Sequence, residues 1–287
     1  MEQSRMAFGG EPRPVTGTDV LEFLMKGRAF VALIIVVAIF AILVPGLLEL
    51  NSVIVMATHV AGVALMAIGV TFVILSGGID LSVGSIVGVT GMIAGGLINE
   101  GIRLPFLGIV LFPKIWMVIL LTLLFGIMLG AINGLVITRL KVAPFIATLG
   151  MLYAARGLAG LRNNGYTFPN LVGNEAIGNQ GFSEIGSGTF INFTERIGIP
   201  WPIWIMVLFA VAAYYVTKKL PFGRHVYALG GNRRVAQLSG VRVELTETMV
   251  YVISGFCSAM VGLILTSRLV AAHPMNGFGY ELTAIAA

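Results

Sequence analysis

Long runs of apolar residues alternate with short polar stretches along most of the chain. Because a helix needs about 20 mostly apolar residues to cross the hydrocarbon core of a bilayer, runs of that length indicate membrane spans. Those that reach or approach it lie at residues 29–48, 52–75, 81–98, 115–137, 142–161, 199–216 and 248–266. The pattern predicts an all-α polytopic membrane protein with about seven transmembrane helices.

Two intervals between these runs need separate interpretation. Residues 104–112, LPFLGIVLF, are apolar, but they contain Pro105 and are too short to span a bilayer. We expect them to form an interfacial lead-in to the fourth helix. Residues 162–198 are rich in Gly, Asn, Ser and Thr, which predicts a polar outer loop that could hold a short hairpin.

The positions of Lys and Arg predict the orientation, since cytoplasmic loops of membrane proteins carry an excess of both. If the N-terminus is cytoplasmic, the alternation of spans places every dense basic cluster on the inner side. The predicted organisation is therefore a cytoplasmic tail at 1–28 and a transmembrane domain at 29–287. The latter includes the outer loop 162–198 and a cytoplasmic loop at 217–247.

Composition excludes a soluble fold. The chain has 57% hydrophobic and 11% charged residues, whereas a soluble domain has about 25% charged residues. Many of its 37 glycines lie inside the apolar runs, and Gly126, Gly130 and Gly134 repeat at four-residue spacing. Such spacing lets membrane helices approach closely, although a glycine face could also line a conduit.

An acidic residue stands near the start of the third apolar run, in SGGIDLSVGS at residues 76–85. One interpretation is that Asp80 caps the helix and suits the positive end of its dipole. The other is that Gly77 and Gly78 break a helix beside a water-filled cavity, because irregular backbone at membrane depth must be covered by protein or water. Asp80, Ser82 and Ser85 would then offer hydrogen bonds to a solute.

Polar and aromatic residues also occur around the turn in NGLVITRLKVAPFIATLG, residues 133–150. Phe145 and Thr148 lie on the helix after the turn, where they could pack against neighbours or contact a polar solute such as a sugar. Asn133 belongs to the same candidate translocation pathway.

The loop PFGRHVYALGGNRRVAQLSGV, residues 221–241, is basic and punctuated by glycines between two apolar runs. Pro221 and Gly223 are expected to end the preceding helix, and Gly230 and Gly231 to break the chain again. Asn232 can cap a short helix that Gly240 terminates in the left-handed conformation.

A helix of about two turns is not stable alone in water, so this one must dock on something. The membrane surface is one candidate, with the arginines on lipid phosphates. A groove on a cytoplasmic partner is the other. The residues assigned to this contact are Gly231, Asn232, Arg233, Arg234, Val235, Ala236, Leu238 and Gly240.

The sequence lacks the motifs of several enzyme classes. It contains no G-x-x-x-x-G-K-[ST], H-E-x-x-H or G-x-S-x-G, and its isolated histidines suggest no metal site. We therefore expect a non-catalytic chain without a cofactor of its own and without a nucleic-acid partner. If ATP drives it, ATP and Mg²⁺ bind another subunit.

Several of these segments together resemble the permease subunits of bacterial ATP-binding-cassette sugar importers, the group that handles ribose, galactose, xylose and related solutes. The resemblance covers nearly the whole chain after the polar N-terminus. The matching segments are GGIDLSVGS (77–85), NGL (133–135), PFIATLGM (144–151), PFGRHVYALGGNRRVAQLSGV (221–241) and GYELTAIAA (279–287).

The resemblance implies a set of partners. A second permease copy completes the membrane core, an ATPase pair docks inside, and a soluble solute-binding protein docks outside. It also implies that residues 232–239 form the coupling helix of the loop 217–247, seated in a groove of the ATPase. Members of that family have about ten helices, so we expect this chain to lack C-terminal ones.

The sequence and this resemblance therefore predict a permease of the bacterial inner membrane that imports a monosaccharide or sugar alcohol and performs no covalent chemistry of its own. An ion-coupled secondary transporter that uses Asp80 as its proton site is an alternative. So are a permease for another small polar solute, such as an amino acid, and a non-catalytic anchor of an enzyme complex.

Overall fold

The computed structural model describes residues 27–105, 108–194 and 197–287. The predicted cytoplasmic tail therefore lies almost entirely outside the described residues. The chain divides into two compact units, Met1–Val53 and Ile54–Ala287. The first contains the apolar helix α2 (Arg28–Leu43), and α3 (Leu50–Leu75) begins at its end and continues through the second.

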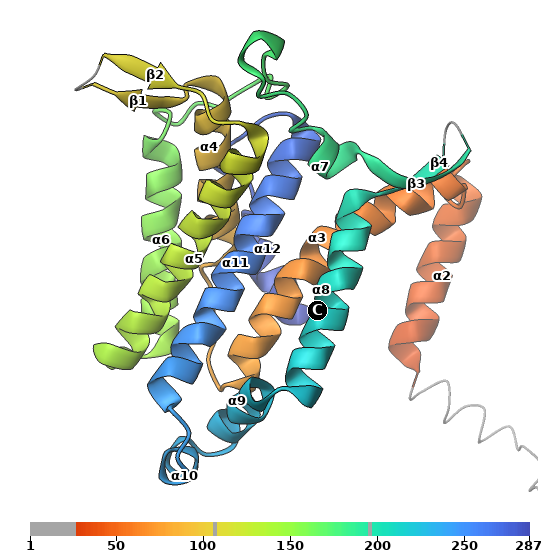
Figure 1. Cartoon of the computed structure of the whole chain (residues 1–287). Helices are drawn as coiled ribbons and strands as arrows, with labels where there is room; N and C mark the ends of the chain where they lie inside the picture. The colour runs from red at the N-terminus through yellow and green to blue at the C-terminus, as the bar shows by residue number, and fades with distance from the viewer. Residues whose placement is uncertain (1–26, 106–107, 195–196) are drawn as a thin grey trace, which may run out of the picture. The chain divides into compact units, whose positions relative to one another are not determined.

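The second unit is a bundle of apolar helices (Figure 1). Besides α3, they are α4 (Val83–Asn99), α5 (Ile115–Arg139), α6 (Pro144–Leu161), α8 (Trp201–Lys219) and α11 (Val243–Leu269). Of the helices in the described residues, α3, α5, α6, α8 and α11 are long and apolar enough to cross a membrane, whereas α2 and α4 are shorter. A helix thus occupies each apolar run of the sequence, and the polytopic helical prediction is confirmed.

Helix α4 is short because the chain before it is unwound. Its 17 residues are about 25 Å long, less than the roughly 30 Å hydrocarbon core. Residues 76–82, here called the unwound segment, connect it to the end of α3. Figure 1 shows α3 reaching the lower end of the bundle, α4 in its upper part, and a non-helical trace rising between them.

The sequence around Gly77 explains where α3 stops. Gly77 has φ +86, a left-handed conformation that glycine adopts without steric cost. The amide of Gly77 donates to the Ile74 carbonyl, and the amide of Gly78 donates to the Val73 carbonyl, both at 2.9 Å. These two bonds form a Schellman motif, which ends a helix while satisfying its last carbonyls.

Glycines bring α5 and α11 into close contact. A Cβ at Gly130 would overlap the Tyr251 carbonyl oxygen, and a Cβ at Gly134 would lie 2.7 Å from Thr248 Cα. A Cβ at Gly126 would overlap the side chain of Ala259. The glycine ladder is therefore a packing face.

The segments at the upper end differ in part from the sequence prediction. The expected lead-in at 104–112 is wrong, because β1 (Ile102–Leu104) and β2 (Ile109–Leu111) form an antiparallel hairpin. Its turn is closed by a bond from the Gly108 amide to the Pro105 carbonyl, with Gly108 at φ +63. Proline and glycine thus favour a turn where we expected an approach to a helix.

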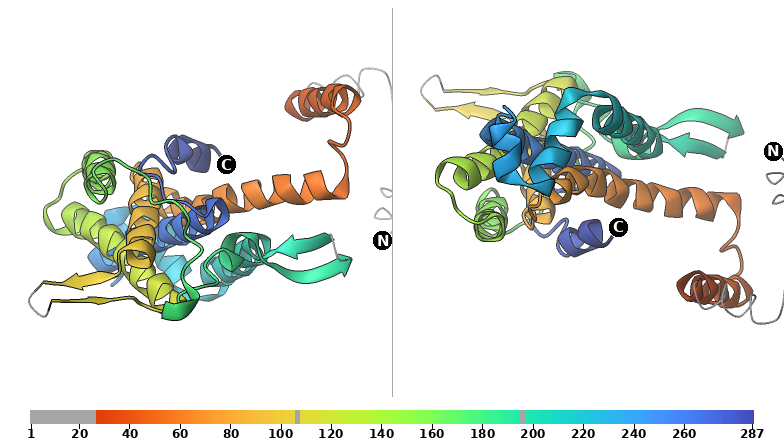
Figure 2. Two further views of the ribbon diagram at one scale, coloured as in Figure 1. Left: turned by 90° about the horizontal axis from the view of Figure 1, so that it is seen from above. Right: turned by 90° about the horizontal axis from the view of Figure 1, so that it is seen from below.

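The loop 162–198 contains the hairpin that its composition allowed. Strands β3 (Thr189–Thr194) and β4 (Ile197–Pro200) pair antiparallel, after the short helices η1 (Glu175–Ile177) and α7 (Glu184–Ser187). Figure 2 shows this hairpin and the β1–β2 hairpin projecting to opposite sides of the bundle. The loop 162–198 is folded against α11, since Gly186 donates to the Ser267 hydroxyl at 2.8 Å.

Three further helices complete the described chain. Two of them, α9 (Pro221–Gly231) and α10 (Arg233–Leu238), lie at the lower end of the bundle between α8 and α11 (Figure 1). The third, α12 (Tyr280–Ala286), follows a second non-helical stretch at 270–279.

The glycine contacts generate a prediction for folding in the membrane. Gly130→Val should destabilise the folded protein by about 1–3 kcal/mol or more, because its side chain meets the α11 backbone. Gly150→Val on α6 is the matched control, since nothing lies within 4 Å of a Cβ there. The measurement is the yield and thermal stability of monodisperse protein in detergent. Equal stability of the two variants would contradict the α5–α11 contact.

Candidate functional site

The Asp80 carboxylate is the centre of a buried polar cluster in the unwound segment. Its Oδ1 accepts from the Ser82 amide at 2.9 Å and from the Ser82 hydroxyl at 2.6 Å. Its Oδ2 accepts from the Ser254 hydroxyl of α11 at 2.7 Å. Asp80 is 1% exposed, so hydrogen bonds from the protein replace water around both of its oxygens.

The prediction that Asp80 caps the following helix is wrong. The N-cap residue of α4 is Ser82, and no side chain donates or accepts a capping bond there. Asp80 instead stabilises the turn before the helix and links it to α11. The alternative interpretation of a chain broken at Gly77 and Gly78 describes the backbone correctly.

Two more predicted pathway residues hold the unwound segment from other helices. The Asn133 side chain of α5 donates to the Ser82 hydroxyl at 2.9 Å. The Thr148 hydroxyl of α6 lies 3.2 Å from the Ile79 carbonyl and 2.9 Å from the Pro144 carbonyl. Side chains of α5, α6 and α11 therefore converge on one unwound stretch of backbone.

The structure thus brings together most of the predicted pathway residues. Asp80, Ser82, Ser85, Asn133 and Thr148 are all buried. Phe145 differs from these buried residues, because its side chain on α6 is 52% exposed. That these residues line a solute path stays a prediction.

Ser254 was missed in the sequence, although a signal for it exists. Ser254 and Ser258 lie one turn apart on the apolar helix α11, and both are buried. A hydroxyl inside an apolar span needs a partner, which can be its own backbone or another helix. Ser258 bonds the Ser254 carbonyl at 2.9 Å, whereas Ser254 bonds Asp80.

A second non-helical stretch, residues 270–279, packs beside α4. Arg156 of α6 donates from Nη1 to the Pro274 and Asn276 carbonyls at 2.8 and 3.0 Å. An unwound backbone leaves carbonyls without helical partners, and Arg156 satisfies two of them.

The loop below the bundle contains a helix that the sequence prediction did not include. Helix α8 ends just before Pro221, as predicted, and Pro221 then occupies the first turn of α9, where its missing N–H costs nothing. The part of the prediction that concerns Gly223 is wrong, because Gly223 lies inside α9. Gly223, Val226 and Leu229 are buried on one face of that helix. The spacing of Phe222, Val226 and Leu229 was the signal that could have predicted it.

The short helix α10 has the predicted ends. Asn232 Oδ1 accepts from the amides of Arg234 and Val235 at 3.0 and 3.1 Å, which is an N-cap. Gly240 has φ +84 and donates to the Gln237 carbonyl, while the Val241 amide donates to the Ala236 carbonyl. This is again a Schellman motif, and the cap and the left-handed glycine are both confirmed.

One part of the apolar face of α10 packs against the chain itself, and the other part is exposed. Ala236 is 3% exposed and packs with Leu229 and Val243. The expectation that Ala236 is free to contact a partner is therefore wrong, because the short helix must anchor itself on the loop. Val235 and Leu238 remain 57% and 76% exposed. The other residues assigned to this contact, Gly231, Asn232, Arg233, Arg234 and Gly240, are exposed.

An acid at the base of α11 was also missed. The Arg233 guanidinium lies 2.6 Å from Glu247 Oε2, with side chains 53% and 8% exposed. A second ion pair, Arg139 to Glu244 at 3.5 Å, is exposed on both sides. Glu247 differs from Glu244 because its carboxylate is almost fully enclosed.

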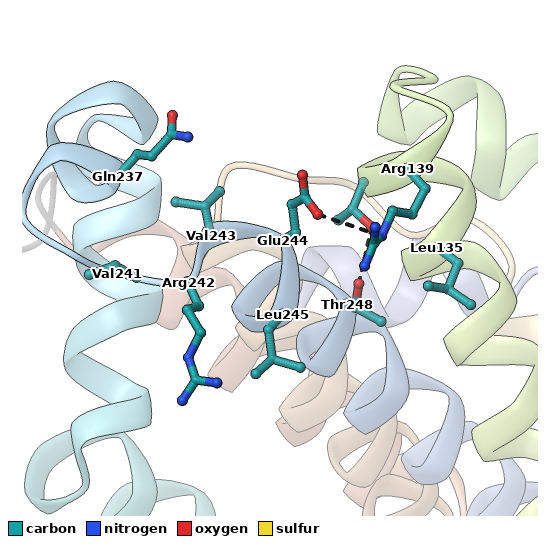
Figure 3. Close-up of a pocket in the computed structure, with 10 residues that line it drawn as sticks. Leu135, Arg139, Gln237, Val241, Arg242, Val243, Glu244, Leu245 and Thr248 are labelled. Carbon is teal, nitrogen blue, oxygen red and sulfur yellow. Dashed lines mark hydrogen bonds and ion pairs between the residues drawn. The ribbon is translucent and has the colours of Figure 1, made fainter.

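Two hollows adjoin this loop. One of about 500 Å³ lies between the end of α5 and the start of α11, with the Arg139–Glu244 ion pair across it (Figure 3). The other, of about 850 Å³, reaches from α10 to the start of the unwound segment at Ser76 and Gly77. Among the described residues, no group of three His, Cys, Asp or Glu side chains could hold a metal ion.

Comparison with known proteins places this arrangement in context. Residues 52–287 match the family described as "Branched-chain amino acid transport system / permease component". The ribose import permease proteins of Haemophilus influenzae and Bacillus subtilis are each 40% identical to the chain. These alignments cover 92% and 100% of this chain and 76% and 78% of those proteins.

A further relative carries the name of a different sugar. The D-allose transport system permease protein of Escherichia coli is 36% identical, over 92% of this chain and 74% of its own length. No solved structure matches the chain.

The hydrogen bonds of Asp80 generate a prediction for this site. Asp80→Ala should lower stability by about 1–3 kcal/mol, because Ser82 and Ser254 each lose a buried acceptor. Asp80→Asn should lower it less, since its oxygen can still accept from Ser82 and its amide can donate to the Ser254 hydroxyl. Thermal unfolding of the purified variants measures both effects. If Asp80→Asn is as unstable as Asp80→Ala, the negative charge itself is required.

Proposed function

Because the chain belongs to the family of branched-chain amino acid transport system permease components, we propose that it is the membrane permease subunit of an ATP-driven importer for a monosaccharide or sugar alcohol. The observation that carries the cargo class is the identity of 40% with ribose import permeases across nearly the whole chain. The allose permease, at 36% identity, supports the same class of solute.

In this proposal the chain performs no covalent chemistry. ATP and Mg²⁺ bind a separate cytoplasmic ATPase, and a solute-binding protein delivers the sugar from outside. A second copy of the permease completes the conduit. The chain lies in the bacterial inner membrane with its N-terminus in the cytoplasm, an orientation supported by the basic residues of the loop 217–247.

We place the ATPase contact on α10. Its cap and glycine terminus fix a rigid two-turn helix, and Ala236 anchors it to the permease. Val235 and Leu238 remain exposed on this basic loop. Burying one Leu side chain contributes roughly 1.5–3 kcal/mol, so this small apolar surface is sufficient for a docking anchor.

Two other functions have less support. An ion-coupled transporter would use Asp80 as a proton carrier. The Asp80 carboxylate, however, is enclosed, and both of its oxygens already accept hydrogen bonds from Ser82 or Ser254. An amino-acid cargo is suggested by the description of the family. The relatives that align over most of the chain are named for sugars, which favours a sugar.

Leu238 provides the test of the ATPase contact. Leu238→Glu should weaken capture of the ATPase by about tenfold or more, since it places a charge in a contact that excludes water. The internal fold should be unaffected because Leu238 is 76% exposed. Leu161→Glu is the matched control, with 77% exposure at the other end of the bundle.

The measurement is affinity purification of the tagged permease from its own host, followed by quantification of the ATPase and of sugar uptake. Equal ATPase recovery with both variants would place the contact elsewhere. Failure of the unmodified permease to recover any ATPase, or uptake that persists without ATP, would contradict the proposed function itself.

A further inference from the structure

We propose that Glu247 is a positioning residue through which movement of the loop 217–247 reaches the unwound segment that holds Asp80. The inference rests on the proposed function, because it concerns how an ATPase bound at α10 acts on the permease. Docking of the ATPase on α10 requires neither the Arg233–Glu247 ion pair nor the face of α11 that carries Glu247.

The first link is the ion pair between α10 and α11. Glu247 is enclosed, and its carboxylate lies 2.6 Å from a guanidinium nitrogen of Arg233. Removing the partner of a buried charge is unfavourable, so Arg233 keeps its place beside Glu247 when α10 is displaced. Force applied to α10 is thus borne by α11.

The second link lies along one face of α11. Glu247, Tyr251 and Ser254 stand at i, i+4 and i+7, which places them in a row on the same side of a helix. Tyr251 is fully buried, and a Cβ at Gly78 would overlap its hydroxyl. The next residue in the row, Ser254, donates to Asp80. Three successive side chains therefore connect the ion pair to both Gly78 and Asp80.

A separate contact joins the loop to the other end of the unwound segment. A Cβ at Gly230 would overlap the carbonyl oxygen of Leu75, the last residue of α3. The glycine brings the end of α9 directly against the backbone where the unwound segment begins. The loop thus touches the start of the segment directly through α9, whereas α11 reaches Gly78 and Asp80 further along it.

The Arg233–Glu247 ion pair and Gly230 line the hollow of about 850 Å³. Its lining includes Ser76 and Gly77 of the unwound segment together with Asn232, Arg233 and Glu247. Displacement of α10 must change the shape of this hollow, because two of its walls are the elements that the ion pair joins. Closely packed elements of this kind shift as units and do not deform continuously.

The experiment compares Glu247→Gln with Glu244→Gln in the full chain assembled with its ATPase in proteoliposomes. Glu244 is the matched control: it lies one turn earlier on α11 and pairs with Arg139, but both side chains are more than half exposed. ATPase recovery, ATP hydrolysis and sugar uptake are measured on the same preparations. Arg233→Gln is the second variant, since it breaks the same ion pair from its half-exposed side.

Glu247→Gln should recover the ATPase within about twofold of the unmodified protein, because Val235 and Leu238 are untouched. Sugar uptake per ATP hydrolysed should fall by about tenfold, within the range of coupling between linked sites. Arg233→Gln should reduce the same ratio, and Glu244→Gln should leave it unchanged. A purely structural ion pair would instead lower protein yield and leave the ratio intact.

The inference is overturned if the ratio is unchanged in Glu247→Gln and Arg233→Gln, or falls equally in Glu244→Gln. If Glu247→Gln does not accumulate in the membrane, Arg233→Gln alone decides. Failure of the proposed function has a different signature, because the unmodified chain would then recover no ATPase.

Discussion

The carboxylate of Asp80 holds a stretch of non-helical backbone inside a bundle of apolar helices. Unwound backbone is unfavourable at membrane depth, since its polar groups have neither helical partners nor lipid ones. Asp80 makes the arrangement possible by bonding Ser82 within the segment and Ser254 on α11. Asn133 and Thr148 complete the anchoring from α5 and α6. Helix α4 is short because it begins only where this segment ends, and nearly all of its residues are buried.

A similar run of residues occurs a second time in the chain. Residues 78–82 read Gly-Ile-Asp-Leu-Ser, and residues 279–283 read Gly-Tyr-Glu-Leu-Thr. The first set lies in the unwound segment between α3 and α4, and the second begins at the end of the non-helical stretch after α11 and enters α12. The two regions meet, because a Cβ at Gly84 would overlap the Gly277 carbonyl and the Glu281 carboxylate. Paired interruptions of this sort are typical of the regions where transporters handle their solutes.

The sequence predicted the parts of the structure that depend on local patterns. Apolar run length located the helices, the glycine ladder indicated a close helix contact without naming its partner, and Asn232 with Gly240 located both ends of α10. Two of the errors arose because the decisive partner lies in another helix. Asp80 looks like a helix cap until Ser254, which lies on α11, is placed beside it. Likewise, Ala236 cannot be recognised as an internal anchor without Leu229 and Val243.

Hydrogen–deuterium exchange on the permease in lipid nanodiscs tests the central claim most directly, that Asp80 and Ser254 hold the unwound segment inside the bundle. The account predicts that backbone amides of residues 76–82 exchange as slowly as those of α4, although they are not helical. In Ser254→Ala, the segment should lose this protection while α5 keeps its own. Exchange of residues 76–82 in the unmodified protein as fast as that of the exposed α10 would contradict the account.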